Sequence, residues 1–250
     1  MKPGVLKGLL PIAVVLALWQ LLGSPHSTTL PAPSAWWQAF ERLRDQGQLW
    51  SALRTTVQLF LVGLVLAVII GVAVGTALGA SRRFNRALNP LLEFLRTIPA
   101  PAIVPAAILL TGLNDRSAIG VIVFGAVWPV LLSTASARAA LPESRLDVAR
   151  TLNLSWPART WKIVLPSLLP AILTGVRVAA PICLIMTLLA DFLLTSGGLG
   201  QLLVQLQQQF DAAGTFALLA VIGIVGLLLN LAIAGFERLV LRRWPGGAKT

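Results

Sequence analysis

The stretch TTVQLFLVGLVLAVIIGVAVGTALGAS (55–81) decides the fold of this chain. It carries no charge and is longer than the roughly 20 apolar residues with which a helix crosses the ~30 Å hydrocarbon core of a bilayer. The same criterion, applied outward along the chain, finds five more runs. They are Gly8–Leu22, Thr97–Asn114, Ser117–Ala137, Ile163–Ala190 (interrupted only by Arg177) and Ala212–Phe236. We therefore predict an all-α polytopic membrane protein with six transmembrane helices.

The composition supports a membrane protein and excludes several other classes. Hydrophobic residues make up 56% of the chain and charged residues 12%, and the mean hydropathy is +0.83. Soluble domains carry about 25% charged residues, so this chain could not cover a water-exposed surface. One cysteine, Cys183, cannot form an internal disulfide, and one histidine, His26, cannot build a histidine-based metal site. We expect no metal site and no nucleic-acid partner.

The distribution of basic residues predicts the orientation. The net charge is +11. If each run crosses the membrane, the connecting segments lie alternately on its two sides, and Lys and Arg are concentrated on one of these sides, as in SRRFNR (81–86). Only Arg42, Arg44 and Arg116 lie clearly on the other side. By the positive-inside rule both termini are cytoplasmic. The first run starts like a signal peptide, but no A-x-A-like cleavage site follows Leu22, so we expect an uncleaved helix.

Two features of the runs suggest how the helices pack. The second run has a small residue at every fourth position: Gly63, Ala67, Gly71, Gly75 and Gly79. In lipid such a stripe lets helix backbones approach closely, either within one chain or between two copies. The third run contains Pro99, Pro101 and Pro105, which remove backbone hydrogen bonds at membrane depth. Such breaks are tolerated where protein or a water-filled path covers them, so this run is a candidate pathway helix, with a simple kink as the alternative.

The fifth run contributes three further candidates for the translocation path, Arg177, Thr187 and Asp191. For Arg177 the structural alternative is snorkelling, or a contact with backbone carbonyl groups. Asp191 lies 14 residues beyond Arg177, about 21 Å along a helix, so the two cannot pair within it.

One long segment between the fourth and fifth runs is too polar for the bilayer: LPESRLDVARTLNLSWPARTWKIVLP (141–166). Pro142 and Glu143 suit the first turn of a helix, and Asn153 can end that helix because asparagine tolerates the left-handed conformation. Ser155 can cap a second helix that has Pro157 in its first turn. We predict a cytoplasmic helix–turn–helix with a basic, partly apolar surface that another protein grips.

At these residues the chain resembles a known family. Asp147-Val148-Ala149, then Asn153, then Ile163 and Leu165-Pro166 follow the spacing of the EAA loop of ABC importer permeases, with Asp, Val and Asn in place of the usual Glu, Ala and Gly. Further motifs fall in the order of the nitrate/sulfonate/taurine branch of those permeases. They are LPAPSAWW (30–37), SRRFNRALNPLLEFLRTIPAPAIVPAAILLTGL (81–113) and LLADFLLTSGGLGQLL (188–203).

The resemblance implies a single permease domain, residues 1–250, in a bacterial inner membrane. It would pair with a second permease, a copy (a homodimer) or a paralogue, and with two ATPase subunits that bind ATP and Mg, and a periplasmic binding protein would deliver a small polar or anionic solute. The coupling segment, 141–166, would dock on the ATPase. The residues that the resemblance and the segment's pattern assign to coupling are Glu143, Leu146, Asp147, Ala149, Arg150, Asn153 and Leu154.

Two other classes of function compete with this interpretation. The chain has no G-x-x-x-x-G-K-[ST] loop, so it should bind no ATP and no cofactor, and it should not be an enzyme. A proton- or ion-coupled secondary transporter would need acidic residues within the spans, where Asp191 and a local Glu93–Arg96 pair are the candidates. Ser196 beside glycines superficially suggests a serine hydrolase, but His26 lies in the outer segment, too far away in sequence to pair plausibly.

The predicted orientation can be tested with reporter fusions. An enzyme that is active only in the periplasm should be active when fused after Trp50 or Asn114, and silent when fused after Arg86, Arg159 or Lys249. The measurement is reporter activity in intact cells. Activity after Arg159 would place the coupling segment outside and overturn the scheme.

Overall fold

The computed structural model describes residues 3–24, 27, 29–194 and 197–242, and this part of the chain is helical without β-strands. His26 and Ser196 lie outside the described residues. The elements, in chain order, are α1 (Pro3–Leu22), α2 (Pro33–Asp45), α3 (Gln48–Ala80), α4 (Arg82–Thr97), the 3₁₀ turn η1 (Ala100–Ile103), α5 (Val104–Thr111), α6 (Asp115–Ala139), α7 (Glu143–Thr151), α8 (Trp156–Arg159), the π turn η2 (Thr160–Val164), α9 (Leu165–Leu194), α10 (Leu199–Gln208) and α11 (Ala212–Arg242).

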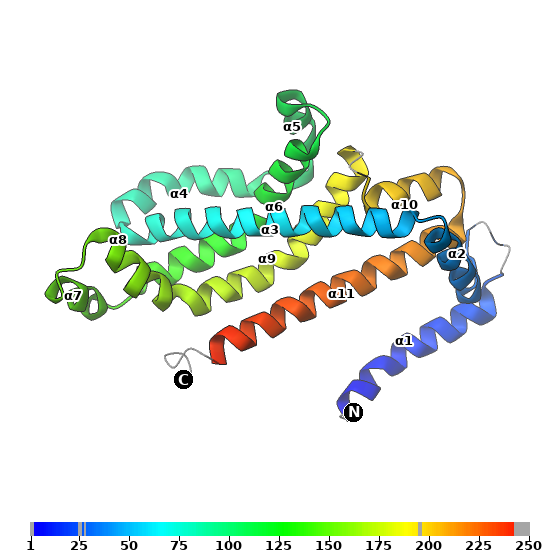
Figure 1. Cartoon of the computed structure of the whole chain (residues 1–250), viewed down its shortest axis with the longest axis horizontal. Helices are drawn as coiled ribbons and strands as arrows, with labels where there is room; N and C mark the ends of the chain where they lie inside the picture. The colour runs from blue at the N-terminus through cyan, green and yellow to red at the C-terminus, as the bar shows by residue number, and fades with distance from the viewer. Residues whose placement is uncertain (1–2, 25–26, 28, 195–196, 243–250) are drawn as a thin grey trace.

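Four helices of the described chain are long and apolar enough to cross a membrane. They are α3, α6, the continuous helix Trp156–Leu194, and α11. The apolar part of α1 within the described residues, Ala13–Leu22, is shorter than a span. In Figure 1 the spans run side by side, with α7 and α8 at one end and α2 and α10 at the other. The all-α membrane fold is thus present, while the count of six spans stays a prediction.

The third run is not one helix, so the expected span Thr97–Asn114 is wrong. α4 ends at Thr97, and α4 and the η1–α5 segment meet at a 90° bend. The cause is local, because Ile98 precedes Pro99 and takes the extended conformation (φ −68°, ψ 120°) that a following proline favours. Pro105 then lies in the first turn of α5, where its missing N–H costs nothing. A membrane crossing here would have to combine α4 with α5.

The small residues of α3 pack against α6 of the same chain. A Cβ built on Gly71 would lie 2.9 Å from Val130 Cβ, and one on Gly75 would lie 2.6 Å from the Leu131 carbonyl oxygen. Gly63 and Gly79 meet α6 as closely. The stripe therefore brings two backbones into contact inside one chain, as the first of the two sequence interpretations states, and it does not form a seam between copies.

α6 in turn packs against α9, so the core is a layer of three helices with α6 in the middle. Gly175 of α9 faces the backbone of Pro129 and Val130, and Met186 lies against Gly125. Smaller clusters close the two ends: Leu43, Leu49, Leu202, Leu206 and Leu218 at the α2–α10 end, and Val164, Leu168 and Ile172 at the α7 end. This layer fixes the positions of the segments at both ends.

The close contact between α3 and α6 predicts that a larger side chain at its glycines lowers the free energy of unfolding. Gly75→Ala should lower the stability of the purified protein by about 1–3 kcal/mol, because the new methyl group must push a backbone carbonyl away. The measurement is the melting temperature in detergent. Gly223→Ala on α11 is the matched control, since a Cβ there meets nothing within 4 Å. Equal melting temperatures for the two variants would contradict the close approach.

Candidate coupling segment and translocation path

The segment that follows α6 forms the predicted first helix and turn. α7 begins at Glu143, directly after Pro142, with the acidic side chain in its first turn. It ends at Thr151, and Asn153 has a positive φ of 47°. The expectation that Asn153 adopts the left-handed conformation after this helix is confirmed. Asparagine is suited to this position because its short polar side chain reduces the steric penalty that other residues pay.

The second helix of the expected pair is not a separate element. α8 begins at Trp156 and continues through η2 into α9, so one helix runs from Trp156 to Leu194. Ser155 occupies the N-cap position, but its side chain makes no capping hydrogen bond. The π turn has a local cause, because Pro166 has no N–H to offer the preceding turn. The coupling segment is therefore joined rigidly to a membrane-spanning helix.

Large apolar side chains are exposed on this segment. Trp156 is 77% exposed, Trp161 is 72% exposed and Leu152 is 64% exposed. Leu146 instead packs inward against the Val164, Leu168 and Ile172 cluster and anchors α7 to the base of α9. Among the other coupling candidates, Glu143 and Asp147 are exposed and Leu154 is half-buried, while the side chains of Ala149 and Arg150 lie outside the described residues. Exposed tryptophans beside charged groups are typical of a protein-binding surface.

The path candidates identified from sequence do not come together. Pro99, Pro101 and Pro105 are exposed and lie at the break between α4 and α5. Thr187 is fully buried and donates a 2.8 Å hydrogen bond to the Cys183 carbonyl one turn earlier in its own helix. Arg177 Nη1 lies 3.6 Å from Glu237 Oε2 on α11, an ion pair in place of the carbonyl contact that we considered. Within the described chain, Glu93 accepts a 2.9 Å bond from Asn89 instead of pairing with Arg96.

Asp191 is fully buried where α3, α9 and α10 meet. Thr56 Oγ1 donates a 2.5 Å hydrogen bond to Asp191 Oδ2 and accepts a 2.8 Å bond from the Leu199 N–H. Gly198 and Gly200 also pack against Asp191: a Cβ on Gly198 would overlap its carboxyl group, and one on Gly200 would lie 2.8 Å from its Cβ. Asp191 Oδ1 has no partner among the described residues. The Thr56 hydroxyl group thus fastens both Asp191 of α9 and the start of α10 to α3, and neither Thr187 nor Asp191 faces an open path in this conformation.

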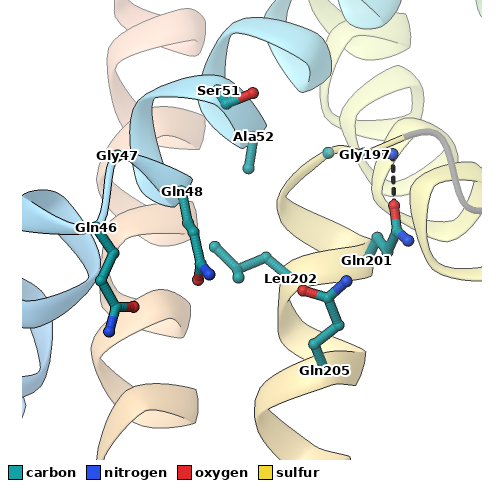
Figure 2. A pocket seen from close by; sticks show the side chains of 10 residues that line it. Gln46, Gly47, Gln48, Ser51, Ala52, Gly197, Gln201, Leu202 and Gln205 are labelled. Carbon is teal, nitrogen blue, oxygen red and sulfur yellow. Dashed lines mark hydrogen bonds between the residues drawn. The ribbon is translucent and has the colours of Figure 1, made fainter.

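A polar hollow lies beside this contact, at the α2–α10 end of the molecule. It measures ≈ 370 Å³, and Gln46, Gln48, Ser51, Gln201 and Gln205 supply its polar side chains. Figure 2 shows these side chains around the opening, with the Gly197 N–H donating to Gln201 Oε1 at 2.6 Å. Gly47 turns the chain into α3 here with a φ of 72°. The glutamine-rich segment 201–210 forms helix α10 over most of its length.

Comparison with known proteins decides the family. The model of the "Binding-protein-dependent transport system inner membrane component" family matches residues 63–245. The chain belongs to this family. A putative aliphatic sulfonates transport permease protein, SsuC of Bacillus subtilis, is 31% identical over 242 residues, covering 96% of this chain and 88% of SsuC. The bicarbonate transport system permease protein CmpB of Synechococcus elongatus is 33% identical over 251 residues, covering 94% and 90%.

A solved transporter structure has the same fold as this chain. An inward-facing methionine ABC transporter, MetNI, aligns with a TM-score of 0.67 at 19% identity, over 79% of this chain and 98% of that chain. The permease is thus a multi-pass membrane subunit, as the sequence predicted. Sequence reasoning missed Thr56 and Glu237, since each partners a residue more than 50 positions away, and hydrophobic periodicity carries no information on such pairs.

The contact between Thr56 and Asp191 can be tested by substitution. Thr56→Val keeps the shape but removes the donor to Asp191 and the acceptor of the Leu199 N–H. It should therefore lower stability by about 1–3 kcal/mol, the cost of a buried polar group left unpaired. Thr56→Ser retains the hydroxyl and is the control. The measurement is the melting temperature of the purified permease. Equal values for the two variants would show that the hydrogen bonds do not hold α10.

Proposed function

We propose that this permease is the membrane subunit of an ATP-driven importer for a small anion of the sulfonate, bicarbonate or nitrate class. It would act with a second permease, a copy or a paralogue, and two ATPase subunits that hold ATP and Mg. A periplasmic binding protein would deliver the anion at the α2–α10 end. Both termini would be cytoplasmic, in a bacterial inner membrane.

The observation that carries the proposal is the combination of exposed apolar side chains and a rigid connection at α7 and α8. Trp156 and Trp161 lie at the start of the helix that runs without interruption to Leu194. Exposed tryptophans at a cytoplasmic end suit a groove in another protein, since aromatic anchors carry much of the energy of interfaces. Because the helix is continuous, a force applied at Trp156 reaches its other end, where Asp191 accepts a hydrogen bond from Thr56, the residue of α3 that also holds α10.

The charge pattern and the relatives support an anionic solute. Two relatives, SsuC and CmpB, are named as permeases for aliphatic sulfonates and for bicarbonate. The net charge of this chain is +11, and a positive protein field raises the local concentration of anions. The buried acidic group expected of a proton-coupled carrier, Asp191, is instead engaged in a structural contact with Thr56.

Docking can be tested at the exposed apolar side chains. Trp156→Ala and Leu152→Asp should leave the permease folded, because both side chains are mostly exposed. They should weaken co-purification of the ATPase and lower ATP-driven uptake in vesicles, by about 30-fold if Trp156 is an interface anchor worth ~2 kcal/mol. Trp50→Ala, at the outer end and 58% exposed, is the matched control.

Two outcomes would contradict this proposal. Normal ATPase association and normal uptake in both coupling variants would show that the segment does not dock. Uptake that continues without any ATPase and follows the proton gradient would favour a secondary transporter.

A further inference from the structure

Helix α4 carries one stripe of charged and amide side chains along its whole length. Its sequence, RRFNRALNPLLEFLRT (82–97), places these groups three or four residues apart, which is the spacing of one helix face. We call these residues the α4 stripe: Arg82, Asn85, Arg86, Asn89, Glu93 and Arg96. The opposite face carries exposed apolar side chains, among them Phe84 and Leu91. No described residue of α4 is buried within the chain.

The α4 stripe reaches from the inner end of the molecule to the middle of a membrane span. Arg82 follows the inner end of α3 directly, and α4 then runs back alongside α3 (Figure 1). At its other end, Glu93 and Arg96 line a crevice together with Trp128 and Leu131 of α6. Trp128 lies near the middle of α6 (Asp115–Ala139). From Arg82 to Arg96 the helix rises about 21 Å, or two thirds of a ~30 Å hydrocarbon core.

Lipid cannot be what surrounds the α4 stripe. An arginine at the centre of a bilayer costs about 2.5–3.5 kcal/mol or more, and such residues face protein or a water-filled cavity. None of the ion pairs found between described residues involves an arginine of α4. An amphipathic helix can avoid the problem by lying flat in the interface, but α4 runs along the spanning helix α3 (Figure 1). No described carboxylate of this chain pairs with these arginines, so the chain itself leaves the stripe open to water at membrane depth.

Open space is present along the stripe. A hollow of ≈ 530 Å³ is lined by Arg82, Asn85, Arg86, Asn89 and Pro90. Farther along, the crevice shared with α6 contains Asn85, Asn89, Glu93 and Arg96. Glu93 accepts a 2.9 Å bond from Asn89, so its charge is partly satisfied within the stripe. Three arginines against one glutamate leave a net charge of two positive units, and rings or rows of arginine are the usual lining of anion-selective pores.

We infer that the α4 stripe lines the inner half of a water-filled path that carries a small anion, and that Arg86 and Arg96 are successive contacts for it. The inference rests on the proposed function for the direction and energy source of transport, but not for the lining itself. The stripe ends where the backbone bends at Ile98 and Pro99. An anion leaving Arg86 inward meets Arg82, at the cytoplasmic end of α4, and is released there.

Thiol labelling tests the lining without requiring transport. Cys183, the native cysteine, is fully buried, so single cysteines can be introduced into the full-length permease in native membranes with its ATPase. The probes are an anionic ethylsulfonate and a cationic ethylammonium methanethiosulfonate. Relative to their rates on a free thiol, Asn89→Cys should favour the anionic probe by ~10-fold or more, as a positive cleft does for anions. Leu91→Cys, on the opposite face of α4, is the control and should react with neither.

The labelling has two outcomes that would overturn the inference. One is a ratio of the two rates at Asn89→Cys equal to that of a free thiol, and the other is no reaction at Asn89→Cys. Neither result depends on whether the importer runs on ATP, so failure here is distinct from failure of the proposed function.

Uptake then tests the arginines as contacts. In vesicles with ATP and the binding protein, Arg86→Gln and Arg96→Gln should lower the initial uptake of radiolabelled ethanesulfonate by ~10-fold, with ATPase co-purification unchanged. Arg83→Gln, on α4 but outside the stripe, removes the same charge and should transport normally. Equal uptake by Arg96→Gln and Arg83→Gln would overturn the role of Arg96. If the unaltered importer takes up no ethanesulfonate, the choice of solute in the proposed function fails, and the labelling ratio alone decides the stripe.

Discussion

A bilayer interior offers no hydrogen-bond partner to a peptide group or a charge, and the architecture of this permease follows from that constraint. Helices satisfy their own backbone, so α3, α6, α11 and the Trp156–Leu194 helix cross as long uninterrupted elements. Apolar side chains gain no hydrophobic free energy when they move from lipid to a neighbouring helix. The helices are instead held by van der Waals contact, which is strongest where glycines let the backbones approach closely. The contact of Gly71 and Gly75 with α6 is of this kind. It makes α3 and α6 a single rigid unit.

The same rigidity connects the two ends of the molecule. The helix that presents Trp156 at one end carries Asp191 near the other, and α6 packs against it along its length. At the α10 end, Asp191 and Thr56 join α9, α3 and the start of α10 through buried hydrogen bonds. A buried carboxyl group is costly unless it is hydrogen-bonded, so this junction holds a single geometry. Movement at α7 and α8 therefore has a mechanical route to the α10 end of the molecule.

Much of this could be predicted from the sequence, and the failures share one cause. Uncharged runs located α3, α6 and α11, and the tolerance of asparagine for a positive φ located the turn at Asn153. A criterion based on uncharged runs treats every residue at membrane depth as facing lipid. It therefore excludes the charged helix α4 and predicts one span over Thr97–Asn114, although the helix breaks at Ile98 and Pro99. Partners distant in sequence, such as Thr56 for Asp191 and Glu237 for Arg177, leave no periodic signal.

Charged groups at membrane depth fall into two kinds here, and the difference separates structure from transport. Arg177 lies 3.6 Å from Glu237, and Asp191 accepts a hydrogen bond from Thr56 in a fully buried position. Each of these groups has a partner on another helix, so these contacts hold helices together. The arginines of α4 lie on an exposed face and have no carboxylate partner among the described residues. Within the described chain, their charge is left to solvent or to an anion dissolved in it. We therefore infer that α4, whose composition is too polar for a typical membrane span, is the helix that lines the path of the solute.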